Sequence, residues 1–328
     1  MTIGIAAYGP NAGLAVWRAL RAVEGVGRGA IGGFASFVAL GPGSTVLRAQ
    51  IQRGGAAALF TGAEPPSELA AARLAGVMSS GPDRPEPLSQ FTPADGTVGL
   101  VTGHRLPNVP GVSGRAPNED VLALMRAGLS PRAAITRVLA ADPLADAGLI
   151  ALDRQGRLWA ADAPRVRSRG DRGAARLGSA RAGAAVAVLH NAILPHRPLA
   201  ALAAEVALDA MAPADRVDAT VAMTAGVPVT LGPQPRIVLD RQGRLVRIET
   251  ADPRHQTGRW SLGLGWRTEI HRAGRPWAYA VHEPYLVVED GRLVSIDGSS
   301  TLDLPVARTA APTGQGERER ALVGSGGQ

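Results

Sequence analysis

Thr2 is the first residue whose type and position could support chemistry, because it directly follows Met1. Removing Met1 would leave Thr2 with a hydroxyl group and a free α-amine, the pair of groups that an N-terminal threonine uses as nucleophile and general base. An α-amine has a pKa of about 7.7–8.0, so it accepts protons near neutral pH. The small threonine side chain permits removal of the preceding methionine. The sequence therefore predicts Thr2 as a candidate nucleophile.

Groups that would assist such a nucleophile occur further along the chain. A tetrahedral intermediate needs hydrogen-bond donors for its oxyanion, and we expect Asn108 or the backbone amides of Gly32 and Gly33 to supply them. An arginine can hold a substrate carboxylate through its planar guanidinium group, and Arg28 and Arg105 are the candidates. These residues define the predicted catalytic and substrate-binding site.

The residues that are missing exclude several other chemistries. The chain contains no cysteine and no lysine, which excludes a cysteine nucleophile, a disulfide, a thiolate metal site, a lysine Schiff base and a phosphate-binding P-loop lysine. The six histidines form no HExxH pattern, and no GxSxG motif is present. The glycines of residues 25–33 follow a predicted helix rather than a strand, which argues against dinucleotide binding. We therefore expect neither a metal ion nor a cofactor.

The charge of the chain is strongly positive, with a formal net value of +7. Basic proteins often bind nucleic acids, but here all the basic residues are arginines spread along the chain among 28 acidic residues. The densest cluster, residues 165–181, contains Asp171 and no aromatic residue for base stacking, and Asp162 is nearby. It predicts a solvated, flexible loop, with an anion-binding loop as the functional alternative. No secretory signal or bilayer-spanning segment is evident. We expect a cytoplasmic protein that binds neither nucleic acid nor membrane.

The elements that must position these residues alternate between strands and helices. Periodicity, glycine and proline positions and capping residues predict the following elements: strands over 2–8, 34–40, 45–52, 97–103 and 184–189; helices over 11–24, 119–127, 130–142 and 198–211, with Asn11, Asn118 and Ser130 as caps; and a hairpin over 149–161. The proline-rich residues 61–95 are predicted to form an insertion with one helix over 67–77. The heptapeptide at Leu152–Leu158 recurs at Leu239–Leu245, which we interpret as a recurrent hairpin turn.

Residues 97–162 carry a resemblance to a known group of proteins. The segment Arg126-Ala-Gly-Leu-Ser130 with its helix pair, followed by the hairpin with Asp153 and Gln155-Gly-Arg157, resembles an uncharacterised Ntn-hydrolase-like family. The Met1-Thr2-Ile3 start resembles the same family more weakly. This resemblance implies a layered Ntn-type fold and an N-terminal nucleophile. A second resemblance concerns Asp95-Gly96-Thr97, which is similar to the internal cleavage point of isoaspartyl-peptidase-type asparaginases and implies Thr97 as a lower-ranked nucleophile.

The sequence as a whole predicts an α+β fold, an Ntn-hydrolase-like layered sandwich of antiparallel sheets with flanking helices. We expect an Ntn-like domain over 1–215, a β-rich region over 216–308 and a disordered tail over 309–328. The predicted function is hydrolysis of an amide or peptide bond in a small molecule or peptide, with Thr2 as nucleophile. The alternatives are a small-molecule-binding protein without catalysis and a structural protein whose flat faces pair, which leaves a homo-oligomer open.

Overall fold

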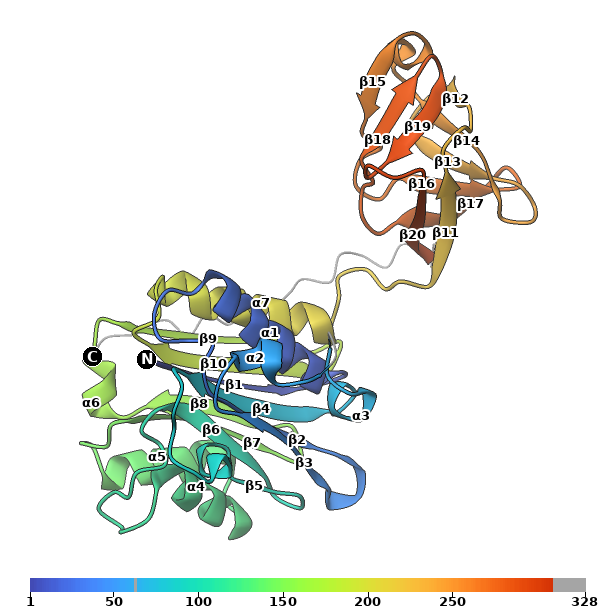
Figure 1. Ribbon diagram of the computed structural model, residues 1–328. Helices are drawn as coiled ribbons and strands as arrows, with labels where there is room; N and C mark the ends of the chain where they lie inside the picture. The colour runs from blue at the N-terminus through green and yellow to red at the C-terminus, as the bar shows by residue number, and fades with distance from the viewer. Residues whose placement is uncertain (62–63, 309–328) are drawn as a thin grey trace. The chain divides into compact units, whose positions relative to one another are not determined.

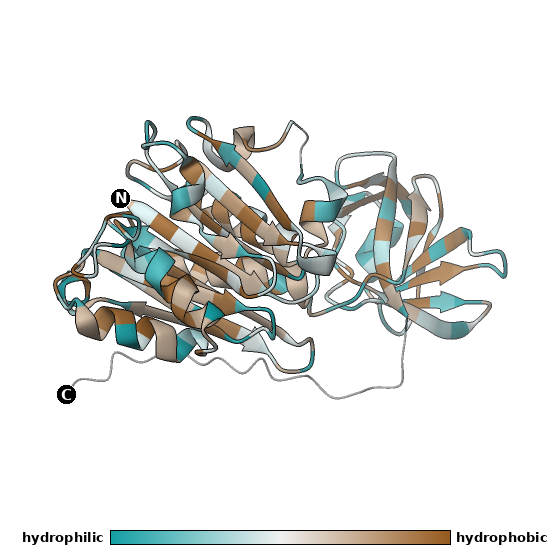
Figure 2. Cartoon of the chain, turned by 90° about the horizontal axis from the view of Figure 1, so that it is seen from below, coloured by the Kyte–Doolittle hydropathy of each residue, from teal (hydrophilic) through white to brown (hydrophobic). Residues whose placement is uncertain are grey.

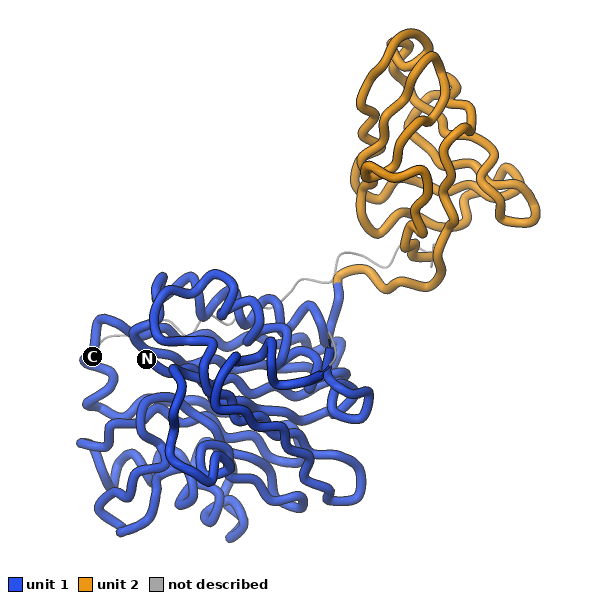
Figure 3. Tube along the Cα trace, viewed as in Figure 1, with its two compact units in different colours: residues 1–213, 317–328 blue, residues 214–316 orange. Residues whose placement is uncertain are grey.

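The computed structural model describes residues 1–61 and 64–308 and divides into two compact units between Pro213 and Ala214 (Figure 3). Each unit has its own hydrophobic core. The predicted tail over 309–328 lies outside the described residues. Within the described part of the chain, no helix is both long enough and apolar enough to cross a bilayer.

The first unit contains ten strands and most of the helices of the described chain. In chain order they are β1 (Thr2–Tyr8), α1 (Ala12–Val26), β2 (Ala35–Leu40), β3 (Val46–Ile51), α2 (Gly55–Ala58), α3 (Ser67–Ala70), β4 (Leu74–Ser80), β5 (Ala94–Asp95), β6 (Gly99–Arg105), α4 (Pro117–Arg126), α5 (Pro131–Ala141), β7 (Ala147–Asp153), β8 (Leu158–Asp162), α6 (Pro164–Arg167), β9 (Arg172–Ser179), β10 (Ala184–Asn191) and α7 (His196–Met211); single 3₁₀ turns span Pro42–Ser44 and Leu88–Phe91.

These elements form four layers (Figure 1). A six-stranded sheet has the order β3-β2-β4-β1-β10-β9, and a four-stranded sheet has the order β5-β6-β7-β8. Every strand pair in both sheets is antiparallel. Helices α1 and α7 cover the outer face of the larger sheet, α4 and α5 cover the outer face of the smaller one, and the two sheets face each other. The unit is thus a mixed α/β structure of facing antiparallel sheets with helices outside, as the sequence predicted.

The alternation of side chains along β1 explains how this strand serves two cores. Ile3 and Ile5 point toward α1 and α7, whereas Ala6 points into the core between the sheets. Because successive side chains of a strand point to opposite faces, Thr2 and Gly4 also face the second sheet. The sheets approach closely there, since a Cβ atom on Gly4 would lie 2.3 Å from the carbonyl oxygen of Gly103. In Figure 2, apolar residues in brown run along the strands.

The predicted insertion over 61–95 is where the expectation of a helix over 67–77 is wrong. Helix α3 ends at Ala70, and β4 then runs between β2 and β1 inside the larger sheet. Every residue of β4 is buried, so its sequence Leu-Ala-Gly-Val-Met-Ser-Ser shows no alternation between apolar and polar positions. A short apolar run of this kind does not distinguish a buried strand from a helix by periodicity.

The arginine-rich residues 165–181 form ordered elements rather than the predicted flexible loop. Helix α6 is followed by β9, which is the edge strand next to β10. The arginines have partners that the sequence does not reveal: Arg172 lies 3.2 Å from Asp162, and Arg176 stacks 5.1 Å from the ring centre of Trp159. Arginine can occupy an edge strand because its guanidinium group reaches solvent or a partner while its aliphatic stem packs.

The predicted helix caps differ in their outcome. The Ser130 hydroxyl accepts the backbone N–H of Ala133 at 3.3 Å, which confirms it as the N-cap of α5. Asn11 has a left-handed backbone and makes no capping bond. Asn118 lies inside α4, whose cap is Ala116, and its amide donates instead to the carbonyl oxygen of Gln90 at 2.7 Å. The two asparagine caps were therefore wrong, because these side chains serve other contacts.

The second unit consists of short strands. They are β11 (Ala219–Thr224), β12 (Val229–Leu231), β13 (Arg236–Leu239), β14 (Leu245–Thr250), β15 (Arg259–Leu262), β16 (Glu269–Arg272), β17 (Arg275–Ala280), β18 (Leu286–Glu289), β19 (Arg292–Ile296) and β20 (Thr301–Arg308). They form a seven-stranded sheet, β11-β20-β17-β16-β13-β14-β12, and a three-stranded sheet, β15-β18-β19. This unit is β-rich, as predicted.

The repeated heptapeptide forms the same turn in both units. Asp153 accepts the backbone N–H of Arg157 at 2.9 Å, and Asp240 accepts that of Arg244 at 2.9 Å. The glycine of each copy has a positive φ, 80° at Gly156 and 87° at Gly243, which glycine adopts without steric cost. The interpretation of the repeat as a recurrent hairpin turn is confirmed.

Candidate functional site

Thr2 lies in the middle of a row of three polar side chains at one end of the larger sheet. It pairs with Ser80 of β4 on one side and with Asn191 of β10 on the other. Directly opposed residues of neighbouring strands project to the same face, so all three side chains face the second sheet. All three are buried, and Thr2 is 3% exposed with Met1 in place.

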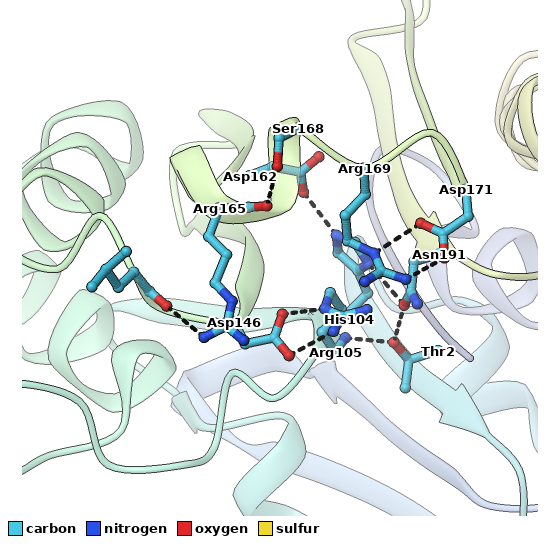
Figure 4. Close-up of polar contacts among 11 residues, drawn as sticks. Thr2, His104, Arg105, Asp146, Asp162, Arg165, Ser168, Arg169, Asp171 and Asn191 are labelled. Atoms are coloured by element: carbon cyan, nitrogen blue, oxygen red, sulfur yellow. Dashed lines mark hydrogen bonds and ion pairs between the residues drawn. The ribbon is translucent and has the colours of Figure 1, made fainter.

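The Thr2 hydroxyl both donates and accepts a hydrogen bond (Figure 4). It donates a hydrogen bond to Oδ1 of Asn191 at 2.9 Å and accepts the backbone N–H of Arg105 from the facing strand β6. The Thr2 oxygen therefore lies at the point where the two sheets meet. A backbone N–H aimed at a hydroxyl oxygen stabilises negative charge on that oxygen, so this contact favours an alkoxide.

The second sheet contributes a buried histidine and aspartate behind Asn191. His104 is fully buried, and its Nδ1 lies 3.3 Å from Oδ1 of Asn191 while its Nε2 lies 2.7 Å from Oδ1 of Asp162. The two residues flank Gly148 of β7 in the register of the sheet. A Cβ atom on Gly148 would lie 2.2 Å from Nε2 of His104 and 2.3 Å from Oδ1 of Asp162. The absence of a side chain at Gly148 is what lets them meet.

Asp162 is held in its charged form by its neighbours. Burial acts to raise its pKa, but the hydrogen bond and charge of His104, together with Arg172, outweigh burial and hold the pKa below its usual range. A carboxylate at this position orients the imidazole of His104. The imidazole in turn fixes the side-chain amide of Asn191, which contacts Thr2. The order of contacts is thus Arg172, Asp162, His104, Asn191 and Thr2.

Two further arginine–aspartate pairs surround the start of β1. The Arg105 guanidinium makes two hydrogen bonds to Asp146, one of them 2.6 Å long, and lowers the pKa of that carboxyl. Arg169 likewise makes a bidentate pair of hydrogen bonds with Asp171 and lowers the pKa of that carboxyl. Across residues 1–61 and 64–308, no three histidine, aspartate or glutamate side chains converge as metal ligands.

The α-amine at Met1 lies among these charges. Burial lowers its pKa, and the positive charges of Arg84 and Arg105 lower it further, against an opposing effect of Asp171. The Met1 side chain packs over the loop after α1, where its sulfur accepts the backbone N–H of Ala30 at 3.0 Å. An amine with a lowered pKa is uncharged in a larger fraction of molecules at neutral pH, so the environment at the start of β1 favours a base.

Comparison with known families places this site within a single family match. The model of the family described as a domain of unknown function (DUF6963) matches residues 2–220, well over half of the 328-residue chain. The chain belongs to this family. Every residue of the site described above except Met1 lies within the DUF6963 match. Residues 226–301 match a second model, described as a domain of unknown function (DUF7259). No curated protein matches the chain significantly.

Within the DUF6963 unit, the structure brings one of the predicted site residues to Thr2. Arg105 contacts Thr2, but through its backbone N–H, and its guanidinium is paired with Asp146. Asn108 instead donates to Oε1 of Gln90 at 2.9 Å. The backbone N–H of Gly33 donates to the carbonyl oxygen of Ser80 at 3.0 Å. The Gly33 amide is thus occupied within the larger sheet.

The remaining predicted residues lie on the loop after α1. Arg28 is exposed, and its backbone forms an isolated bridge with Leu194. Gly32 has a φ of 79° and lies beside Glu24, from which a Cβ atom would be 4.0 Å away. Neither residue makes a side-chain or backbone hydrogen bond with Thr2 in the described structure.

Thr97, the lower-ranked nucleophile, lies in the tight turn between β5 and β6. It is exposed, and both its backbone N–H and its hydroxyl donate to Oδ1 of Asp95, at 2.9 and 2.7 Å. Asp95 is in turn bound by Arg126. These are the contacts of an aspartate-stabilised turn, at the end of β6 opposite to Arg105.

The residues that the sequence analysis did not select are His104, Asp162, Asn191 and Ser80. His104 precedes the selected Arg105, but as a single histidine it carries no motif. Asn191 and Asp162 lie just beyond the ends of a predicted strand and a predicted hairpin, and Ser80 ends a strand that was not predicted. A polar residue at the end of an apolar run was the available signal, since such positions line the rim of a sheet.

Proposed function

We propose that the chain is an amide- or peptide-bond hydrolase of the N-terminal-nucleophile type, with an Ntn-hydrolase-like four-layer fold and Thr2 as nucleophile. The observation that carries the proposal is the position of Thr2. It begins strand β1 in the interior of the larger sheet and faces the smaller sheet. Its hydroxyl contacts both Asn191 of the larger sheet and the Arg105 N–H of the smaller one. Removal of Met1 frees the amine that the mechanism requires.

The chemistry follows from these contacts. The Thr2 amine accepts the hydroxyl proton as Oγ1 attacks the substrate carbonyl, which gives a tetrahedral intermediate. The amine then returns the proton to the leaving nitrogen, the C–N bond breaks, and an ester of Thr2 remains. Water, activated by the same amine, hydrolyses the ester and restores Thr2. The Arg105 N–H favours the developing alkoxide, and the NH2 group of Asn191 is a donor for the oxyanion, because its amide oxygen faces Thr2 and His104.

His104 and Asp162 act through Asn191 in this proposal. His104 is fully buried behind Asn191, so it does not reach a substrate carbonyl. It is a positioning residue that sets the direction of the Asn191 amide, and Asp162 sets the orientation of its ring. Preorganised donors of this kind contribute about 10²–10³ in rate when they face the oxyanion.

One observation favours the alternative of a binding protein without catalysis. With Met1 present, Thr2 is 3% exposed and its hydroxyl is occupied. A nucleophile needs a carbonyl within about 3–3.5 Å. In the hydrolase proposal, removal of Met1 and of its packing on Ala30 opens that space. In the alternative, Met1 stays and the hydroxyl is only structural.

The test is the state and reactivity of Thr2 in the purified full chain. Intact-mass measurement reports whether Met1 is absent. Incubation with a β-lactone, which acylates an activated hydroxyl, followed by peptide mapping reports whether Thr2 becomes an ester. We expect a processed chain labelled at Thr2, no label in Thr2→Ala, and slower labelling in Thr2→Ser. Retention of Met1, or labelling that Thr2→Ala does not abolish, would overturn the proposal.

A further inference from the structure

The loop after β4 brings one arginine to the site without a carboxylate partner. Arg84 donates from Nε to the hydroxyl of Ser80 at 2.7 Å, and Ser80 is the residue paired with Thr2 in the adjacent strand. The other arginines around Thr2 are neutralised, Arg105 by Asp146 and Arg169 by Asp171. Arg84 makes no ion pair with any residue in the described ranges.

The acids next to Arg84 in the sequence are turned to other partners. Asp83 is bound by Arg53 at 2.6 Å. Glu86 accepts from the side chain of Gln52 at 2.8 Å and from the backbone of Leu88 at 2.9 Å. Arg84 is therefore kept free of both neighbouring carboxylates by specific contacts.

The backbone of Arg84 is also fixed. The side-chain amide of Gln52 accepts the Arg84 N–H at 2.9 Å and donates to the Arg84 carbonyl oxygen at 2.7 Å. Gln52 thus holds the Arg84 backbone and Ser80 holds Nε, while the terminal nitrogens make no hydrogen bond to the described residues. Because Ser80 is the strand partner of Thr2, this contact directs the guanidinium to the strand position next to the proposed nucleophile.

We propose that Arg84 binds a carboxylate of the substrate, so that the amide cleaved at Thr2 belongs to a small, carboxylate-bearing molecule. A planar guanidinium whose two terminal nitrogens are free matches the two oxygens of a carboxylate. Its single charge in excess over the surrounding pairs matches a monoanionic group. This inference rests on the proposed function for the cleavage step, and it replaces Arg28 and Arg105 as the expected carboxylate-binding residues.

The test separates binding from cleavage by using the full chain with Thr2→Ala. Succinamate, glutaramate and adipamate, each with one carboxylate and one amide, are titrated by calorimetry against their neutral diamides, and inorganic phosphate is titrated as a second anion. We expect at least one of these monoamides to bind, with its diamide at least about tenfold weaker, because the diamide lacks the charged partner for Arg84. Arg84→Met should weaken that binding by roughly 10- to 100-fold.

Two further variants control for charge and for folding. Arg126→Met removes an exposed arginine that is paired with Asp95, at the end of β6 opposite to Arg105, and should change binding less than about twofold. Arg84→Lys keeps the charge without the planar fork and should recover only part of the affinity. Melting curves of each variant show whether it is folded. Binding that is absent, insensitive to Arg84, equal for diamides, equally lost in Arg126→Met, or tightest for phosphate would overturn the assignment.

The outcome also separates the two proposals. Thr2 labelling by the β-lactone without Arg84-dependent binding would leave the hydrolase proposal standing and remove the carboxylate assignment. Arg84-dependent binding in a chain that retains Met1 would remove the hydrolase proposal and leave the carboxylate assignment standing. The chain would then be a carboxylate-binding protein.

Discussion

The imidazole of His104 and the carboxylate of Asp162 meet 2.7 Å apart over Gly148, which lies between them in the smaller sheet. This contact is possible because Gly148 has no side chain, and the two residues that it joins are distant in the sequence. It connects the polar row on β4, β1 and β10 to the second sheet, so the geometry at Thr2 depends on how the two sheets face each other.

Substituting Gly148 tests that dependence. In Gly148→Ala the new methyl group would displace His104 and Asp162, and overpacking of a buried site costs about 1–3 kcal/mol. We expect the free energy of unfolding to fall by about that amount, measured by urea denaturation. Gly25→Ala is the matched control, because nothing lies within 4 Å of its new Cβ atom. Since Gly25 is in α1, that variant should be slightly more stable. Equal destabilisation by both variants would contradict this account.

The two asparagines that are candidates for catalysis give a second prediction. Asn191 contacts Thr2, whereas Asn108 contacts Gln90. We expect Asn191→Ala to slow acylation of Thr2 by the β-lactone about 100-fold, as is typical for loss of a preorganised donor. Asn108→Ala should leave the rate within about threefold. The rate constants come from intact-mass time courses on variants whose folding has been checked. A larger effect of Asn108→Ala would show that Asn108, the residue selected from the sequence, is the oxyanion donor.

Glu24 of α1 should make stability depend on pH. Burial raises its pKa to about 7, although the Ala56 N–H and the Ser79 hydroxyl oppose the shift. The folded state therefore binds this proton more tightly than the unfolded state, whose carboxyl has a pKa near 4.5. Its stabilising effect is complete below pH 4.5 and is lost as the pH rises to 7, with a total on the order of 3 kcal/mol. Glu24→Gln should remove this component.

The measurement for Glu24 is the difference in unfolding free energy between wild type and Glu24→Gln at several pH values from 4.5 to 8. The difference cancels contributions from other titrating groups. Glu24→Gln should become the more stable protein relative to wild type as the pH rises. A difference that does not vary with pH would show that Glu24 titrates normally.

His190 should make the protein less stable as the pH falls, which is the opposite of the effect of Glu24. Burial lowers its pKa to about 4, its Nε2 lies 2.7 Å from the carbonyl oxygen of His196, and its Nδ1 is buried without a partner. Folding therefore favours the neutral ring. Its contribution to stability is present above pH 6.5, is lost progressively as the pH falls toward 4, and is on the order of 3 kcal/mol in total. NMR titration should find His190 neutral at pH 5. A charged ring at that pH would contradict the assignment.

Local signals predicted much of the fold. Strand β1, helix α5 with its Ser130 cap and the β7–β8 hairpin all follow from patterns within a dozen residues. Strand β4 did not, because it is buried on both faces and carries no alternation. The apolar segments of β1 and β10 were recognised, but their adjacency in one sheet is a property of the whole chain.

The site was harder to predict for the same reason. Thr2 was identified because its chemistry depends on its position in the sequence. Its partner Asn191 is 189 residues away, and His104 and Asp162 are 58 residues apart. No spacing rule connects such residues. The oxyanion donors expected from the sequence included Asn108 and Gly33, whose polar groups instead bind Gln90 and the carbonyl oxygen of Ser80.

The pairing of β1 with β4 and β10 has a consequence for the timing of events during synthesis. The strand β10 that pairs with β1 ends at Asn191, the partner of Thr2. The edge of β1 that pairs with β10 therefore stays unpaired until about 190 residues have been made, roughly 10–40 s at ordinary translation rates. After that, the residue following Met1 is a strand residue hydrogen-bonded on both sides. We therefore expect an aminopeptidase to remove Met1 faster from the nascent chain than from the folded protein, so that competition between processing and folding affects the fraction of molecules with a free Thr2.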